Sequence, residues 1–199
     1  MARKKQTARE QHAQTQSRST ESEEKESRLY SCVRDTLQSY FCSGSIDCLF
    51  EVTAEGVSDE LQGKLGDEIL FLLGSRELRP DILGHVEHPV ESKTFYYHKF
   101  FVATEVKEGS PTINDLFQAK KYGEIYEAAV TLLVSTEKPE ERLLRLLKRN
   151  PVLLHLPMSM FSAYLCKFSE KSEAIDWWYP EPPRRDQPKL STGPRTDMG

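Results

Sequence analysis

The sequence predicts an α+β fold, with a small antiparallel sheet and helices packed on one of its faces. The run 93–106 is the richest in aromatic and β-branched residues, which is the composition of a β-strand. A second apolar run at 82–88 predicts a hairpin over about 82–106, and alternation at about 46–53 predicts a further strand. After Pro111 the apolar spacing changes from two residues to 3.6, which is typical of helices. Strands early and helices late indicate an α+β domain.

The strand 93–106 is expected to be central and covered on both sides. At a period of two residues, one face carries Phe100 and Val102. The other face carries Phe101, Ala103 and then Glu105. Both faces are apolar in the middle, as in strands that are buried on two sides.

Two helices are expected before the hairpin. Leu29, Val33 and Leu37 recur at helical spacing and predict a helix that ends near Ser43-Gly44. A second helix is expected from Ser58 to Gly74, although glycines inside it disfavour helix. The alternative is a short helix to Gly66 followed by a strand at 69–73.

Helices are also expected throughout the second half of the chain. Ile113 and Leu116 after Thr112 predict one helix, and the apolar residues of 123–133 indicate another. The clearest pattern is 138–149, which has Pro139 in its first turn and basic residues in its last. A short helix at about 158–168 completes this prediction.

Composition divides the chain into three parts. Residues 1–28 form a basic and polar leader, and residues 180–199 form a proline-rich tail. Both are expected to be disordered because they hold too few apolar residues to offset the entropy of ordering. A single α+β domain is expected at 29–179. The formal charge is −4 for the whole chain, +2 for 1–28 and +1 for 180–199, which leaves −7 for the domain. This balance disfavours nucleic acid as a partner of the domain.

The four cysteines are expected to be reduced thiols in the nucleus or, alternatively, the cytoplasm. No apolar secretory region follows the basic start, and intracellular compartments keep thiols reduced. No run approaches 18 consecutive apolar residues, so no membrane-spanning helix is expected.

Linear patterns of catalysis or metal binding are missing from the sequence. His85-x-x-His88 is the closest approach to a metal pair, but on a strand this spacing directs the two rings to opposite faces. There is no glycine-rich phosphate loop and no nucleophile elbow. The prediction is a protein without enzymatic activity, metal or cofactor.

Two further regions are candidates for contact with a partner. Arg142, Arg145 and Arg149 share the outer face of the helix expected at 138–149 and could bind an acidic partner or nucleic acid, although most such faces are simply solvated. Trp177 and Trp178 lie next to the proline-rich tail. These tryptophans either cover the core or form an exposed docking motif, and burial is the favoured interpretation.

The amino terminus carries the clearest functional signal. Residues 2–9 are Ala-Arg-Lys-Lys-Gln-Thr-Ala-Arg. This segment resembles the tail of the core histone that begins Ala-Arg-Thr-Lys-Gln-Thr-Ala-Arg, with Lys4 as the one difference. Removal of Met1 would leave Ala2 with a free amine. The resemblance then stops, because Glu10 and Gln11 stand where the histone has lysine and serine.

The resemblance implies partners among the modules that bind histone tails. Such modules hold the terminal amine in a backbone nest and add the peptide to a sheet edge. Lys5 would be the modified lysine, held in an aromatic cage or an acidic pocket, and Arg3 would pair with carboxylates. The partner-binding residues implied are Ala2, Arg3, Lys5, Gln6, Thr7 and Arg9.

The function expected from these observations is a non-enzymatic, nuclear protein-interaction module. It would present its histone-like leader to chromatin readers or modifiers, as an adaptor or scaffold. The alternative is a scaffold or self-assembling structural protein, for instance viral or meiotic, whose leader is incidental. The expected partners are proteins, and the number of subunits is left open.

Overall fold

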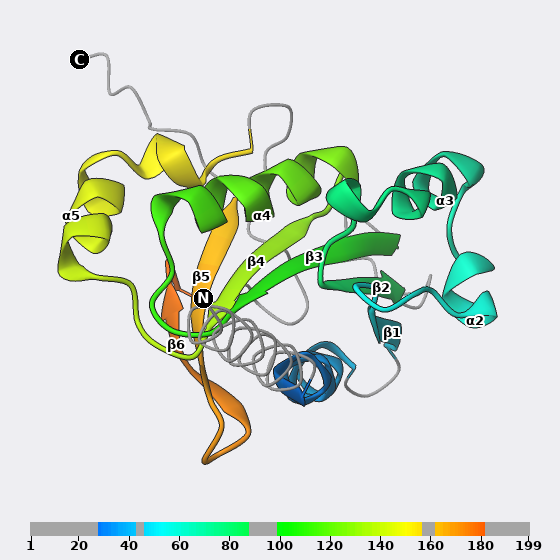
Figure 1. The fold of residues 1–199 in the computed structure, drawn as a ribbon, viewed down its shortest axis with the longest axis horizontal. Coiled ribbons are helices and arrows are strands. Elements are labelled where there is room, and N and C mark those ends of the chain that lie inside the picture. The colour runs from blue at the N-terminus through cyan, green and yellow to red at the C-terminus, as the bar shows by residue number, and fades with distance from the viewer. Residues whose placement is uncertain (1–27, 43–45, 88–98, 157–161, 182–199) are drawn as a thin grey trace, which may run out of the picture.

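The computed structural model contains one six-stranded mixed sheet with the strand order β1-β2-β3-β4-β5-β6 (Figure 1). It describes residues 28–42, 46–87, 99–156 and 162–181. The strands are β1 (Asp47–Val52), β2 (Ile82–Glu87), β3 (Lys99–Lys107), β4 (Val130–Ser135), β5 (Ala163–Ser169) and β6 (Ala174–Tyr179). The helices are an N-terminal helix at 28–41, α2 (Asp59–Gln62), α3 (Asp67–Gly74), α4 (Ile113–Ile125) and α5 (Glu141–Arg149), with 3-10 turns η1 (Arg76–Leu78) and η2 (Pro151–Leu154).

The α+β class is confirmed, but the sheet is larger than the predicted hairpin plus one strand. β1, β2 and β3 form an antiparallel meander, as predicted for the hairpin. β4 and β5 then add in parallel to β3, and β6 closes the sheet antiparallel to β5. α4 connects β3 to β4, and α5 connects β4 to β5, because parallel neighbours need a crossover.

Helices cover both faces of the sheet, so the prediction of helices on one face is wrong. The helix at 28–41 buries Val33, Leu37 and Phe41 against one face. Helices α2 to α5 cover the other face, where α4 lies over β3, β4 and β5. Figure 1 shows α4 above the sheet and the helix at 28–41, in blue, below it. Burial of β3 on both sides, predicted from its two apolar faces, is confirmed.

Two of the predicted helices are strands in the structure. Residues 130–135 form β4 and residues 163–169 form β5, in place of helices expected at 123–133 and 158–168. Both strands are buried on two sides: Leu132 and Leu133 belong to cores on opposite faces of the sheet. A strand buried in this way has a continuous apolar sequence, which periodicity cannot distinguish from a buried helix.

The remaining helices follow their local signals. Thr112 caps α4 through a reciprocal capping box with Asp115, and the helix continues to Ile125. The single helix expected from Ser58 to Gly74 is divided into α2 and α3, with Gly63 and Gly66 between them. The alternative strand at 69–73 is wrong, because these residues are helical in α3.

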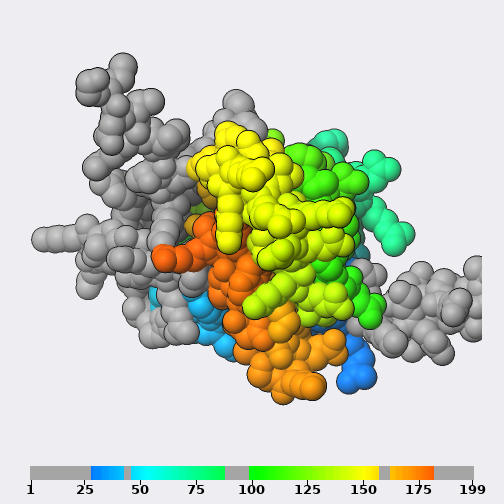
Figure 2. All heavy atoms as spheres, turned by 90° about the vertical axis from the view of Figure 1, so that its left-hand side faces the viewer, coloured from blue at the N-terminus to red at the C-terminus, as the bar shows by residue number. Residues whose placement is uncertain are grey.

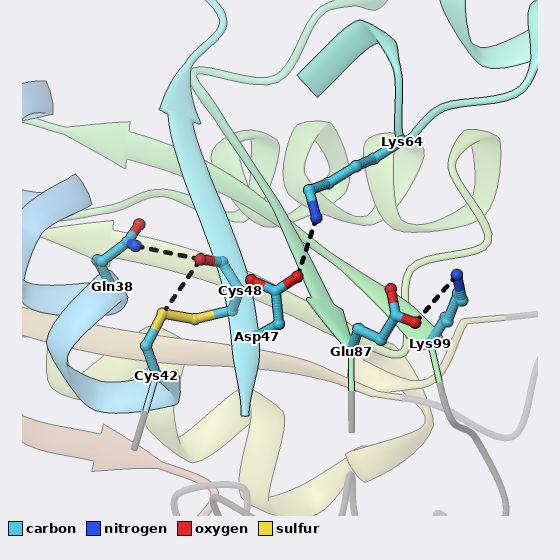
Figure 3. A network of polar contacts seen from close by, with 7 residues as sticks. All are labelled: Gln38, Cys42, Asp47, Cys48, Lys64, Glu87 and Lys99. Atoms are coloured by element: carbon cyan, nitrogen blue, oxygen red, sulfur yellow. Dashed lines mark hydrogen bonds and ion pairs between the residues drawn. A yellow bond between two sulfur atoms is a disulfide. The ribbon is translucent and has the colours of Figure 1, made fainter. Parts of the chain in front are cut away.

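The cysteines differ from the prediction of four reduced thiols. Cys42 and Cys48 form a disulfide that joins the end of the helix at 28–41 to β1, with their Cα atoms 5.6 Å apart. Gln38 supports the same junction by donating to the Cys48 carbonyl at 3.1 Å (Figure 3). It also accepts a hydrogen bond from the Phe50 amide at 2.9 Å. Cys32 and Cys166 are free.

Within the described residues, no helix is both long and apolar enough to cross a membrane.

Candidate active site

The strongest candidate site lies where β2 begins and β3 ends. β2 and β3 are antiparallel, and Ile82 lies opposite Thr104. Asp81, which precedes Ile82, therefore lies beside Glu105, which follows Thr104. Two residues further along β3, Lys107 projects from the same face as Glu105. The fold thus brings two carboxylates and an ammonium together, although 23 residues separate Asp81 from Glu105 in the chain.

The backbone fixes the position of Asp81. Its Oδ2 accepts a hydrogen bond from the Val106 amide at 2.7 Å, which ties it to β3. Its carbonyl accepts from the Thr53 amide at 2.9 Å, and the Thr53 hydroxyl donates to the Pro80 carbonyl. Asp81 is half-buried and is therefore held in place while it remains open to solvent.

Glu105 is the unusual member of the group. Its side chain is only 1% exposed, and Lys107 Nζ lies 2.7 Å from Oε1. The Lys107 ammonium and the Asp81 side chain both lie within hydrogen-bonding range of the Glu105 carboxyl group. Burial raises the pKa of Glu105 to about 8, and the negative charge of Asp81 adds to the increase. Without a bound cation, Glu105 is thus largely protonated at neutral pH.

Lys107 keeps its positive charge. Burial lowers the pKa of Lys107, but the carboxylates of Glu105, Asp81 and Asp115 raise it, and the net shift is upward. Its side chain is 29% exposed, so the ammonium can contact a bound molecule.

α4 forms the wall beside these three residues. Tyr122 is buried, and its hydroxyl accepts a hydrogen bond from Gln118 Nε2 at 3.2 Å. The pKa of Tyr122 is raised, first by burial and then by the charges of Glu105 and Asp81, although Gln118 opposes the shift. Because the charges of Glu105 and Asp81 act on the Tyr122 hydroxyl, α4 lies close enough to the two carboxyl groups to interact with them electrostatically. Asp81, Glu105 and Lys107 are called the acidic site below.

The acidic site was not predicted from the sequence. Pairing Asp81 with Glu105 needs the register of the β2–β3 hairpin, which the composition of the two strands does not specify. A weaker signal was available, because Glu105 and Lys107 lie two residues apart at the end of a strand that is otherwise apolar. A buried acid with a shifted pKa in such a position is typical of functional sites.

The residues predicted from the sequence are divided by the fold. Arg142, Arg145 and Arg149 lie exposed on α5. Trp177 and Trp178 are half-buried on β6 and face opposite sides of the sheet: Trp177 packs with the core under α5, and Trp178 packs on Tyr40 at 5.4 Å between ring centroids. Ala2, Arg3, Lys5, Gln6, Thr7 and Arg9 lie outside the described residues, as does His88.

The acidic site contains two carboxylates, and no group of three or more His, Cys, Asp or Glu residues suited to a metal occurs in the described parts of the chain. This donor set does not fit a closed structural zinc site. It does fit Mg²⁺, which is commonly held by one or two carboxylates together with water and substrate phosphate.

Comparison with family models, curated proteins and solved structures finds no match to this chain.

Proposed function

We propose that this protein is a divalent-cation-dependent hydrolase that cleaves phosphodiester bonds in nucleic-acid strands. The observation that supports this proposal most directly is Glu105, a carboxyl group that is 1% exposed, lies beside both Asp81 and Lys107, and has a pKa raised by burial to about 8. Ionising Glu105 is unfavourable because it is buried beside Asp81, and the single positive charge of Lys107 does not offset both carboxylates. Such an arrangement therefore indicates a site that is completed by a ligand.

Asp81 and Glu105 would hold the cation. Mg²⁺ keeps several of its own waters and takes its remaining ligands from carboxylates and from the phosphate of the substrate. A bound cation would supply a water of lowered pKa and would neutralise charge that develops on the phosphate oxygens. Glu105 would lose its proton when the cation binds, because only the carboxylate is a ligand.

Lys107 would stabilise negative charge next to the cation. Its ammonium is held beside Glu105 and remains charged, so it can contact a phosphate oxygen or orient the attacking water. In the reaction, the attacking water would give up a proton to solvent, its oxygen would form a bond to phosphorus, and the bond from phosphorus to the leaving oxygen would break. The leaving oxygen takes a proton from solvent or from a neighbouring acid.

A polymeric substrate fits the surroundings of the site. Asp81 and Lys107 are half-buried, at the start of β2 and the end of β3, and are partly open to solvent. Small-molecule sites are usually concave and largely apolar, whereas this group is polar and lies near the surface. A strand that passes over the surface can present a phosphodiester to it.

The proposal is tested with the full-length protein and a labelled oligonucleotide. Hydrolysis is expected with Mg²⁺ or Mn²⁺ and is expected to stop with excess chelator. Calorimetry should detect binding of Mg²⁺ to the wild type and no binding to Asp81→Asn combined with Glu105→Gln. Loss of cation binding is the direct readout, since it does not require the correct substrate. A wild-type protein that binds no divalent cation would refute the proposal.

A second function is supported by the sequence of residues 2–9, which matches seven of eight positions of a histone tail. The leader would then present Lys5 to tail-binding modules in the nucleus, independently of the acidic site. A peptide of residues 2–10 should bind such modules and lose affinity on acetylation of Ala2 or on Lys5→Ala. Equal binding of all three peptides would leave the scaffold alternative, in which deletion of residues 2–9 changes neither oligomeric state nor localisation.

A further inference from the structure

The edge strand β6 carries two aromatic rings in a stacked arrangement. Trp177 and Tyr179 alternate along the strand and therefore share one face. Their ring centroids are 6.4 Å apart, and their planes differ by only 14°. Both rings are half-buried, and Lys138 Nζ lies 5.7 Å from the centroid of the Trp177 ring. Trp177 and Tyr179 are called the aromatic pair.

α5 presents a row of cations beside the aromatic pair. Its inner face buries Leu143 and Leu147 in the core that Trp177 and Tyr179 also contact. Its outer surface carries four exposed basic side chains against one acidic residue, Glu141, which lies 3.5 Å from Arg145. These side chains, called the α5 cations, are Arg142, Arg145, Lys148 and Arg149. The local charge is thus opposite to the net charge of −4 of the chain.

The aromatic pair and the α5 cations lie on one surface of the molecule. Figure 2 shows α5, in yellow, next to β6, in red-orange, on the same face. Leu146, on the outer side of α5, is 41% exposed, so this surface also offers apolar contact between the cations. Flat rings next to flexible cations are the combination that recognises bases together with the phosphates that link them.

The same surface is in register with the acidic site. Lys107 pairs with Ser135, Ser135 with Lys167, and Lys167 with Trp177, so these residues form one row across four strands. Lys107 and Trp177 therefore face the same side of the sheet. Three strand spacings separate them by about 14 Å. The loop that links β4 to α5 connects the two regions, since the Thr136 amide donates to the Lys107 carbonyl at 3.2 Å and the Ser110 hydroxyl donates to the Lys138 carbonyl at 3.0 Å.

We infer that the aromatic pair and the α5 cations bind single-stranded nucleic acid. Unpaired bases would stack on Trp177 and Tyr179, and the arginines and Lys148 would contact the phosphates on either side. A duplex fits less well, because its bases are already stacked on each other and present no free ring faces. Delivery of the strand to the acidic site rests on the proposed function, whereas binding to this surface does not depend on it.

Anisotropy of a labelled oligothymidylate, measured with chelator present, separates binding from cleavage. Trp177→Ala is expected to weaken binding about tenfold or more, and Trp177→Phe, which keeps a ring, is expected to retain most of the affinity. The exposed double variant Arg145→Ala/Arg149→Ala should weaken binding. It should also reduce the slope of log Kd against log salt concentration by about 1.4, because two phosphate contacts are lost. This double variant changes only solvent-exposed side chains and so leaves the core intact.

Matched controls come from the remaining surface. Phe71→Ala removes an aromatic ring that is 83% exposed on α3, and Lys171→Ala removes an exposed cation from the turn between β5 and β6. Both should bind as the wild type does. The inference is overturned if the Trp177 and arginine variants also bind as the wild type, if a duplex of equal length binds as tightly, or if polyglutamate of equal charge competes equally well.

Failure of this inference and failure of the proposed function give different results. With chelator present the acidic site holds no divalent cation, so binding of the oligonucleotide under that condition reports on the surface of α5 and β6. Cleavage that is insensitive to Trp177 would overturn the surface alone. Normal binding without cleavage in any divalent cation would overturn the hydrolase alone.

Discussion

The two ends of the β2–β3 hairpin carry the same kinds of charged residue in opposite settings. At one end Lys107 Nζ lies 2.7 Å from Glu105 Oε1, and the glutamate side chain is 1% exposed. At the other end Glu87 and Lys99 pair at 3.1 Å, with side chains 34% and 64% exposed (Figure 3). A solvated ion pair such as that of Glu87 and Lys99 contributes little to stability, and its presence on the surface does not indicate a function. The first pair retains a buried acid next to Asp81, which stability alone does not favour, and this difference supports a role for it in function.

The largest effect expected from this comparison is on hydrolysis. Glu105→Gln keeps the shape of the side chain but removes a cation ligand, so cation-dependent cleavage should fall at least about a hundredfold. Glu87→Gln makes the same chemical change at the opposite end of the same strands and should leave the rate within about twofold. The measurement is initial cleavage rate at saturating Mg²⁺. Equal losses in the two variants would show that the two ends do not differ in function.

A second difference concerns pH. The pKa of Glu105 is raised to about 8 in the folded protein, so a cation must displace a proton below that pH. Mg²⁺ affinity should therefore rise by up to about tenfold per pH unit between pH 6 and 8 and level off above. Calorimetry in buffers of different ionisation enthalpy would report the released proton. An affinity that does not depend on pH would place the cation away from Glu105.

Some elements of the fold could be predicted from the sequence, and others could not. The hairpin, the helix at 28–41 and α5 were predictable because their apolar spacing and end residues are local signals. β4 and β5 were not, since burial on both faces removes the alternation that identifies a strand.

The residues of the acidic site could not be predicted from the sequence either, because their burial and their neighbours depend on the fold. Glu105 and Glu87 both end largely apolar strands, and the composition of those strands does not show which of the two is buried beside a second acid. Trp177 and Trp178 are adjacent and form one motif in the sequence, but β6 directs them to opposite faces of the sheet.

The stability of the cation-free protein provides a third test. Glu105 has a raised pKa in the folded state, so the folded protein binds more protons than the unfolded chain between pH 4.5 and about 8. Its contribution to stability is therefore greatest at low pH and is lost as the pH rises through that range. Glu105→Gln has no such loss and should raise the melting temperature at pH 8 by roughly 5 °C or more, given 2–4 °C per kcal/mol. Added Mg²⁺ should stabilise the wild type and not the variant. A lower melting temperature for Glu105→Gln at pH 8 would contradict this account.

The smallest effects should come from the lysines of the two pairs. Lys107 lowers the pKa of Glu105, so Lys107→Met should move the pH profile of Mg²⁺ binding to higher pH. Lys99→Met removes a cation whose side chain is 64% exposed, and it should change stability by less than about 1 kcal/mol without moving that profile. A double-mutant cycle of Glu87→Gln and Lys99→Met, followed by urea unfolding, would measure their coupling directly. A coupling as large as that between Glu105 and Lys107 would mean that burial does not distinguish the two ends of the hairpin. Burial would then no longer support a functional role for the acidic site.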